Sequence, residues 1–319
     1  MVELEKVIKT DDESLFEIIG GSDEEIEKLQ TAPYSYWREV FSTLFKNKVA
    51  LICFGLLFVI LFFTIFGPMM KYYRPTLPTS EMDAYEFISK DHWFGTTADH
   101  KDLWSLIWRG SQLSLQIAVT VSVINAILGL VIGSLWGFFP KIDPILIEIR
   151  NFINNVPGLL LNMMFMKIFT VNHIPTFLSL VIVMTIFGWL GLASTLRNNI
   201  IIIRNRDFNI ASKTLGSSPR AIITHNLLPF LVSIIVTILA TSIPGVIDGE
   251  VSLAFFNLSF SYPIITLGNV ITSSTSGNSD WISHPHVMLI PSAVTIIMTV
   301  SFYYIGFSLA DATDPRTHR

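Results

Sequence analysis

The sequence predicts an all-α, polytopic membrane protein with six transmembrane helices. Apolar residues make up 51% of the 319-residue chain and charged residues only 14%, whereas a soluble domain carries about 25% charge. The chain also contains six apolar runs, and a run of about 20 residues is enough to cross about 30 Å of hydrocarbon as a helix. Lysine and arginine cluster between these runs in a pattern that orients them in a membrane.

The predicted spans differ in strength. Five are mostly apolar, whereas the third is interrupted by three asparagines, Pro157 and Lys167. In chain order, the six spans cover residues 49–69, 115–139, 152–171, 176–196, 227–247 and 287–310.

The chain ahead of the first span is acidic and then amphipathic. Residues 1–48 hold 11 of the 25 acidic residues, and we expect residues 1–33 to form a partly disordered cytoplasmic leader. Apolar and aromatic residues then recur at helical spacing, which indicates either a helix lying on the cytoplasmic membrane surface or a direct continuation into the first span. Residues 34–70 are therefore predicted to hold this helix and the first transmembrane helix.

The distribution of basic residues predicts that both termini are cytoplasmic. Fifteen of the 21 lysines and arginines lie in the leader, the tail and the connections 140–151 and 197–226, while five lie in the long segment 70–114. The predicted extracellular loop, core of five helices and cytoplasmic tail occupy residues 71–109, 110–310 and 311–319.

The connection between the fourth and fifth spans, residues 197–226, is expected to be functional, because a loop of this length inside a bundle usually is. Its residues are those of two short helices. Asp207 can cap the first helix and Gly216 supplies a left-handed exit. Ser218 can cap a second helix, with Pro219 at its first position. The first helix is too short to be stable alone in water, so its apolar face packs either on this bundle or on another protein.

This loop resembles the cytoplasmic motif of ATP-binding-cassette importer permeases. The motif reads Glu-Ala-Ala, three residues, Gly, nine residues, Ile-x-Leu-Pro. The matching positions, in motif order, are Ile210, Ala211, Ser212, Gly216, Leu228 and Pro229. The glutamate of the motif is absent, because Ile210 stands in its place.

Further segments resemble the C-type subunit of oligopeptide and dipeptide permeases. They are the residues before the first span, a His-x-x-Gly-Thr signature, the start of the second span, the last external loop and a C-terminal signature. The corresponding residues are Phe45–Ala50, His92–Thr96, Arg109–Leu115, Pro263–Gly268 with Trp281, and Leu309–Arg316. Ala32–Trp37 and the tail are most similar to the oligopeptide systems of streptococci and lactococci.

The resemblance implies the type I permease fold of these importers and a function in oligopeptide import. In this family two permease subunits form the pathway and two cytoplasmic ATPases drive it. An external lipoprotein binds the peptide and delivers it to this pathway. The importer is expected in the plasma membrane of a bacterium. The loop helix docks into a cleft on an ATPase and couples its closure to alternating access. The residues implied in this coupling are Asp207, Phe208, Ile210, Ala211, Ser212, Lys213, Leu215, Gly216, Ser217, Pro219, Leu228 and Pro229.

We do not expect enzymatic activity from this chain. It has no Gly-x-x-x-x-Gly-Lys-Ser/Thr phosphate loop, since no glycine is followed by lysine. ATP and Mg²⁺ are therefore expected on the partner ATPases and no cofactor on this chain. His284 and His286 are fewer than the three or four ligands of a zinc site, and we interpret them as polar residues of an external loop. Membrane lipid is an expected partner and nucleic acid is not.

Polar residues within or beside the spans are candidates for the peptide pathway, because such residues usually face a bundle interior or a water-filled cavity. The candidates are Asn125, Asn155, Asn162, Asp248 and Glu250. For the asparagines, the alternative is hydrogen bonding between helices. For the two acids, near the outer end of the fifth span, the alternatives are lining an outer vestibule and simple exposure at the membrane surface.

Other functions fit parts of the sequence. Dipeptide, nickel and glutathione importers use the same subunit family. A self-sufficient secondary transporter usually shows internal repeats and charges in mid-membrane, but the central spans hold only Lys167 and show no convincing repeat. An ion channel needs a selectivity filter or a ring of charges, and none is evident.

Overall fold

The computed structural model describes residues 36–70, 84–218, 221–222, 228–260, 264–275 and 281–313. Their regular structure is helical, apart from one isolated bridge between Thr96 and Asp102, which confirms the all-α prediction. The chain divides into two compact units, Met1–Arg38 and Glu39–Arg319, and the second contains the helical bundle. The predicted leader and the end of the predicted tail lie outside the described residues.

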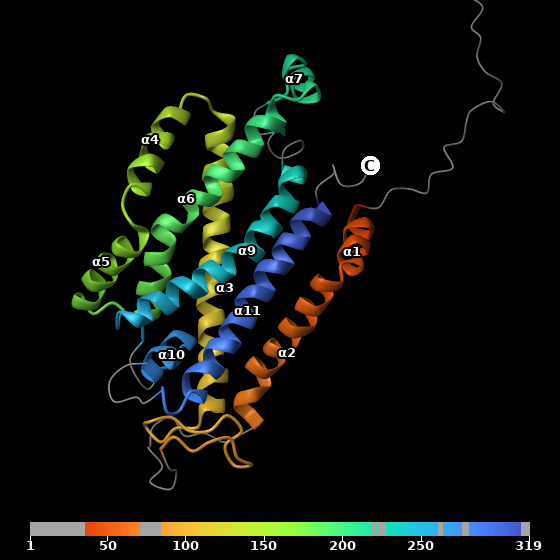
Figure 1. Cartoon of the computed structure of the whole chain (residues 1–319). Coiled ribbons are helices and arrows are strands. Elements are labelled where there is room, and N and C mark those ends of the chain that lie inside the picture. Colours follow the sequence, from red (N-terminus) through yellow and green to blue (C-terminus); the bar gives the residue numbers. More distant parts are fainter. Residues whose placement is uncertain are drawn as a thin grey trace, which may run out of the picture. The chain divides into compact units, whose positions relative to one another are not determined.

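Five described helices are long and apolar enough to cross a membrane (Figure 1). They are α2 (Lys48–Met70), α3 (Leu103–Phe138), α6 (Thr176–Arg204), α9 (Leu228–Phe255) and α11 (His286–Thr313). They correspond to the first, second, fourth, fifth and sixth predicted spans, and they make the chain a multi-pass membrane protein. Helix α3 packs against α6 and α9, while α11 packs against α9 and α2.

Helix α3 begins earlier than predicted. Its 36 residues correspond to about 54 Å at 1.5 Å per residue, well beyond a hydrocarbon layer of about 30 Å. Asp102 caps it, because its Oδ2 accepts a hydrogen bond from the backbone N–H of Ser105 at 3.0 Å. The residues ahead of Leu115 are more polar than the rest of the helix, so a search for apolar runs misses them. The predicted loop 71–109 therefore includes the first turns of α3.

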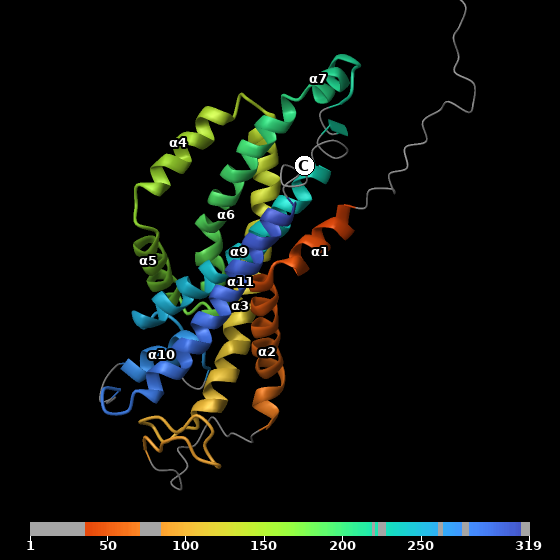
Figure 2. The ribbon, with the colours of Figure 1, turned by 45° about the vertical axis from the view of Figure 1, so that its right-hand side comes forward.

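The predicted third span is not one straight helix. It consists of α4 (Asp143–Asn154) and α5 (Gly158–Val171), which are bent by 82° about the break between them (Figure 2). Pro157 lies in this break: it has no N–H to continue a helix, and it disfavours helical geometry at Val156. The predicted span over 152–171 is therefore interrupted by a break and not one continuous helix, and the bent pair is the sixth candidate for crossing the membrane.

Three glycines bring α3 and α6 together. Gly129, Gly133 and Gly137 recur every four residues on α3, and a Cβ atom added to any of them would lie 2.7–2.8 Å from an atom of α6. Small residues permit this close approach between membrane helices, whose association depends on van der Waals packing. The seam is visible in the sequence as Gly-x-x-x-Gly-x-x-x-Gly, a pattern that our sequence predictions did not use.

Asp143 fastens the start of α4 to its neighbours. Arg197 on α6 donates to both carboxylate oxygens of Asp143, from Nε to Oδ1 at 2.7 Å and from Nη2 to Oδ2 at 2.6 Å. The indole N–H of Trp136 on α3 also donates to Oδ1 at 2.7 Å. Such bidentate pairs fix direction as well as distance, so the beginning of α4 is tied to both α3 and α6.

At the other end of the bundle, segment 84–102 folds onto the start of α3. His92 Nδ1 lies 3.1 Å from Asp102 Oδ1. Thr96 Oγ1 accepts a hydrogen bond from the backbone N–H of Glu86 at 2.8 Å, and Gly95 adopts a left-handed φ of +79°. The His-x-x-Gly-Thr signature therefore builds the cap of a helix.

Two shorter helices complete the fold. Helix α10 (Leu267–Thr275) lies in a stretch predicted as loop, and it packs against α3, α9 and α11. Helix α1 (Tyr36–Lys46) ends before Asn47, whose Oδ1 accepts hydrogen bonds from the N–H groups of Val49 and Ala50 at 3.1 and 3.3 Å. The two helices on either side of Asn47 are therefore separate.

Candidate functional site

The short helix α7 (Asp207–Thr214) stands at the end of the bundle away from segment 84–102 (Figure 1). Asp207 is its first residue rather than its cap, and it places a carboxylate in the first turn, where the helix dipole favours negative charge. Asn209 is 3% exposed, and its Nδ2 donates to the carbonyl oxygen of Ile203 on α6 at 2.9 Å. This hydrogen bond fastens α7 to the end of α6.

The exit from α7 is a left-handed turn at Gly216, as predicted, with φ +83°. The N–H of Leu215 donates to the carbonyl of Ala211 at 3.0 Å, and the N–H of Ser217 donates to the carbonyl of Ser212 at 3.1 Å. The second bond is of the type that closes helix C-termini. A Cβ atom added to Gly216 would meet none of the described atoms within 4 Å beyond its chain neighbours, so the backbone conformation alone favours glycine here.

A second turn begins at Ser218. Its Oγ accepts a hydrogen bond from the N–H of Ala221 at 3.3 Å, and its carbonyl accepts one from the N–H of Ile222 at 3.1 Å, which confirms the predicted cap. Ile222 is buried and packs with Leu196 and Ile200 of α6. The chain therefore returns from α7 to the helix that it left.

The apolar side chains that the structure describes in and just after α7 are exposed. Ile210 is 51% exposed, and Leu215, one residue beyond the helix, is 86% exposed. This favours the alternative in which the helix meets another protein over the one in which it packs on its own bundle. The side chains of Phe208 and Lys213 and all of Pro219 lie outside the described residues.

The structure brings most of the predicted coupling residues together, but not all. Those from Asp207 to Ser217 form one helix-and-turn unit, in which Ala211 is exposed and Ser212 is half-buried. Leu228 and Pro229 are instead the first two residues of α9. They connect the loop to the bundle and are not part of the exposed unit.

Two of the three predicted pathway asparagines remain accessible on this chain. Asn155, at the break between α4 and α5, is exposed, and Asn162 on α5 is half-buried. Asn125 on α3 is buried, and a Cβ atom added to Gly188 of α6 would collide with its amide. Asn125 therefore lies in the contact between α3 and α6, but its Oδ1 has no hydrogen-bond partner among the described residues, so the alternative of hydrogen bonding between helices is not confirmed.

The two acids of the fifth span lie in different environments. Asp248 is exposed. Glu250 is 1% exposed within α9, and its carboxylate accepts hydrogen bonds from the hydroxyls of Ser259 at 3.0 Å and Ser114 at 3.3 Å. This burial contradicts the prediction of an accessible carboxylate at position 250.

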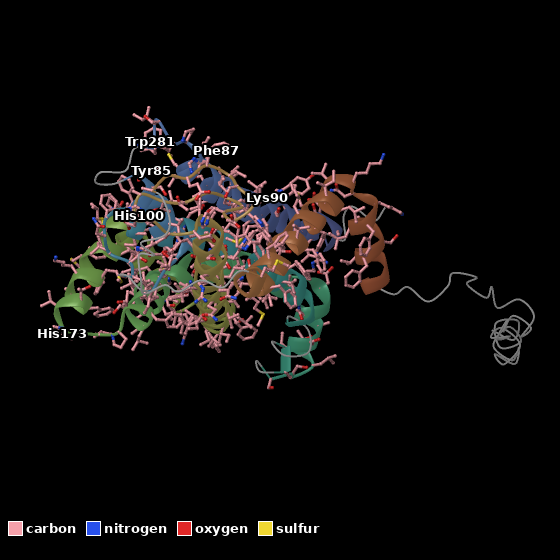
Figure 3. The ribbon with its side chains drawn as sticks, turned by 90° about the horizontal axis from the view of Figure 1, so that it is seen from below. Tyr85, Phe87, Lys90, His100, His173 and Trp281 are labelled. Atoms are coloured by element: carbon pink, nitrogen blue, oxygen red, sulfur yellow. The ribbon has the colours of Figure 1, made fainter. Side chains whose placement is uncertain are left out.

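The histidines near the start of α11 connect segment 84–102 to that helix. Within the described residues, no group of three or more His, Cys, Asp or Glu could hold a metal ion. His286 begins α11 and is 6% exposed, so its interpretation as a polar loop residue is wrong. Tyr85 stacks on His284 with 4.3 Å between ring centroids, and Phe87 meets His286 edge-on at 5.4 Å. Figure 3 shows Tyr85 and Phe87 in the region of Trp281.

Two contacts near these sites have no local signal in the sequence. Asp143 and Arg197 are 54 residues apart in the chain, and Ser114 and Glu250 are 136 residues apart. Patterns of spacing within one helix cannot join such pairs. Only the packing of whole helices brings them into contact.

The bundle is that of a multi-pass membrane protein, with the short helix α7 at one end and its described apolar side chains exposed. Its family follows from comparison with known proteins. Residues 104–319 match the binding-protein-dependent transport system inner membrane component family, and residues 35–87 match the N-terminal transmembrane domain of oligopeptide transport permease C. The chain therefore belongs to the family of binding-protein-dependent transport system inner membrane components.

Relatives match nearly the whole chain. The oligopeptide transport system permease protein AmiD of Streptococcus pneumoniae is 30% identical over 98% of this chain and 100% of its own length. OppC, the corresponding permease protein of Bacillus subtilis, is 26% identical over 96% and 98%. The dipeptide transport system permease protein DppC of Lactococcus lactis is 28% identical over 94% and 97%. These matches confirm the resemblance to C-type permease subunits and disfavour a secondary transporter or a channel.

Proposed function

We propose that this chain is one of two permease subunits of an ATP-driven oligopeptide importer in a bacterial cell membrane. The observation that carries the proposal is the full-length similarity to the oligopeptide permease protein of Streptococcus pneumoniae. The chain forms half of the translocation pathway. A second permease subunit, two cytoplasmic ATPases and an external peptide-binding lipoprotein complete the importer.

In this proposal, α7 docks on one ATPase and transmits its movement to the bundle. Ile210 and Leu215 are available for that contact, and burying an aliphatic side chain contributes about 1.5–3 kcal/mol. The hydrogen bond from Asn209 and the packing of Ile222 both lead to α6. Because both contacts attach the loop to α6, we expect a displacement of α7 to move the end of α6 with it.

The proposal fixes the orientation of the bundle. The end that carries α7 is cytoplasmic, together with the leader and the tail, and α1 lies on the cytoplasmic membrane surface. Segment 71–102 and α10 are then external. ATP and Mg²⁺ bind to the partner ATPases, and this chain holds no cofactor and catalyses no reaction.

Three of the five candidates for the pathway lining are accessible on this chain. Asn155, Asn162 and Asp248 are exposed or half-buried on this chain, so a pathway between two permease subunits can be lined by them. Scattered amide groups suit a passage for peptides of varied side chains, because they can donate and accept hydrogen bonds.

The docking role of α7 predicts that replacing Leu215 with glutamate weakens attachment of the ATPases. The new charge cannot be buried in an apolar cleft without a large desolvation penalty. With the importer expressed as a whole and this chain tagged, we expect at least a tenfold lower recovery of ATPase subunits. Ile282→Glu is the matched control, because Ile282 is 77% exposed beside the start of α11. Equal recovery from both variants would exclude docking through Leu215.

Import itself is measured with the reconstituted importer and labelled tetra-alanine. ATP-dependent uptake supports the proposal, and uptake that needs no ATPase contradicts it. A dipeptide is the second candidate substrate, because DppC of Lactococcus lactis is a dipeptide transport system permease protein. Competition by unlabelled dialanine distinguishes the two.

A further inference from the structure

A buried carboxylate that the proposed function does not use lies at one end of α10. Glu250 of α9 is approached by hydroxyls from three other parts of the chain. Thr266 Oγ1 lies 2.5 Å from Oε1, Ser259 Oγ 3.0 Å from Oε1, and Ser114 Oγ 3.3 Å from Oε2. These hydroxyls place hydrogen-bonding groups beside both oxygens of the buried carboxyl group.

The number of hydroxyl protons in this cluster equals the number of acceptor oxygens that they face. Asn269 Oδ1 lies 2.5 Å from Thr266 Oγ1 and 3.3 Å from Ser259 Oγ, so two hydroxyl protons serve the two acceptors Asn269 Oδ1 and Glu250 Oε1. Asn269 Nδ2 donates to the carbonyl of Phe260 at 2.7 Å. A buried charge destabilises a fold strongly unless it is satisfied in this way.

The cluster holds the first turn of α10. Thr266 caps the helix, because its Oγ1 accepts a hydrogen bond from the N–H of Asn269 at 3.2 Å. Ser114 Oγ accepts one from the N–H of Leu267 at 3.0 Å. Thr266 and Ser114 therefore satisfy two of the N–H groups that a helix start leaves without partners inside the helix.

Close backbone contacts press this turn against α3 and α9. A Cβ atom added to Gly110 of α3 would lie 2.9 Å from the carbonyl carbon of Thr266, and one added to Gly268 would lie 2.9 Å from Cα of Val251 on α9. Near the other end of α10, the hydroxyl of Ser274 donates to the carbonyl of Val287 on α11 at 2.9 Å. Helix α10 therefore joins the ends of three long helices that are distant in the chain.

We propose that Glu250 is a positioning residue of the transport cycle. Its carboxylate locks α10 onto α3 and α9, so that the ends of α3, α9 and α11 opposite α7 move as one rigid body. This rests on the proposed function, in which that end faces outward and must open and close. Packed elements switch between discrete arrangements rather than deforming continuously. Without these hydrogen bonds, α10 is no longer fixed to α3 and α9. Movement that starts at α7 then no longer displaces the outer ends of α3, α9 and α11 together.

The lock is tested first by the accessibility of α10, without any measurement of transport. Cys53→Ala removes the one cysteine, and Val270→Cys then places a thiol at a position that is 2% exposed. In the importer reconstituted in nanodiscs, we expect maleimide to label this thiol at least tenfold faster when Glu250→Ala is added. Thr266→Val, which removes a single donor, should give a smaller increase of about threefold.

Three controls accompany the labelling. Glu250→Gln retains the shape and one acceptor oxygen, so labelling should stay within about threefold of the parent. Ser252→Ala removes a hydroxyl of the same helix that bonds to its own backbone at 2.8 Å, and it should change nothing. Ser273→Cys, at an exposed position of α10, should be labelled equally in every background. Protection of Val270→Cys in both Glu250→Ala and Thr266→Val would overturn the lock.

The second readout separates positioning from general damage. With labelled tetra-alanine, Glu250→Ala should reduce uptake at least tenfold while ATP hydrolysis stays within about twofold, and Glu250→Gln should restore most uptake. A parallel loss of uptake and hydrolysis, or unchanged uptake, contradicts the positioning role. Failure of the parent importer to take up peptide would instead reject the proposed function, while the labelling result still decides whether Glu250 holds α10.

Discussion

Gly216 and Glu250 illustrate two ways in which a single residue can matter in this chain. Gly216 contributes only a backbone conformation, because a Cβ atom there would meet none of the described atoms within 4 Å beyond its chain neighbours. Glu250 contributes a carboxyl group whose hydrogen bonds lie inside the bundle, where the residue is 1% exposed. The first role is visible in a sequence motif, and the second is not.

Replacing Gly216 with valine should uncouple peptide uptake from ATP hydrolysis. A residue with a Cβ atom pays about 1–2 kcal/mol in the left-handed region, which corresponds to roughly a five- to thirtyfold shift in a conformational equilibrium. Insertion in the membrane should be unaffected, because α7 lies outside the long apolar helices. The measurement is uptake of labelled tetra-alanine and ATP hydrolysis in proteoliposomes.

Gly216→Asn is the control for this turn, because asparagine tolerates the left-handed conformation. It should retain most of the uptake that Gly216→Val loses. If both variants transport as well as the parent, the turn has no part in coupling.

Asp248 and Glu250 show how misleading proximity in sequence can be. Residues two apart on a helix with 3.6 residues per turn point about 200° apart, so they occupy nearly opposite faces. Asp248 is exposed and Glu250 is buried for this reason. The prediction that gave both acids the same environment was therefore wrong, because they lie on different faces of α9.

Among the elements, the pair α4 and α5 departs most from expectation. Asp143 fixes the start of α4 to α6 and α3, and the 82° bend redirects the chain. Helix α5 then packs against α6 and α9. If α4 and α5 formed one straight helix, the chain could not have both the attachment of Asp143 to Arg197 and the contacts of α5 with α6 and α9.

The contact between α3 and α6 predicts a strong effect of Gly133→Leu. A Cβ atom at Gly133 would lie 2.8 Å from the carbonyl oxygen of Ala193, a backbone atom that cannot turn aside. Overpacking of this kind costs about 1–3 kcal/mol, so the unfolding temperature of the purified chain should fall by several degrees. Thermal unfolding followed by circular dichroism measures it.

Gly191→Leu provides the comparison, since a Cβ atom at Gly191 of α6 would meet none of the described atoms within 4 Å. It should unfold at nearly the parent temperature. Equal losses in the two variants would mean that leucine itself, and not the helix contact, lowers stability.

For the molecule as a whole, the two functional ends are connected by one helix. Helix α9 has 28 residues, about 42 Å at 1.5 Å per residue. It begins at Leu228, next to the loop that carries α7, and it holds Glu250 near its other end. Because α9 reaches both ends of the bundle, a displacement at its start can be passed along it, and Pro244 within the helix lacks the N–H for one intrahelical hydrogen bond.

Because the chain is proposed to form only half of a pathway, it should not import peptide alone. Cells that express it without its partners should accumulate labelled tetra-alanine no faster than cells that lack it. Expression of the complete importer should raise uptake at least tenfold. Uptake by the single chain would contradict the subunit proposal and would restore the secondary-transporter alternative.

The sequence by itself determined the class of fold, the five long spans and the turn at Gly216. These features depend on local properties: the apolar length of a run, and the one residue type that enters the left-handed region cheaply. The motif around Ile210 and Gly216 also located the exposed unit that the structure shows. Each of these features can be predicted from a short stretch of sequence.

Only the tertiary structure decided which polar residues are enclosed and how the helices end. Pro157 marks the break between α4 and α5, but the 82° angle of the bend and the position of helix α10 depend on the helices around them. The pairing of Asp143 with Arg197 and the enclosure of Glu250 require helices from distant parts of the chain to meet. The physical reason is that the free energy of a buried polar group is set by its partners, and in a bundle those partners come from other helices.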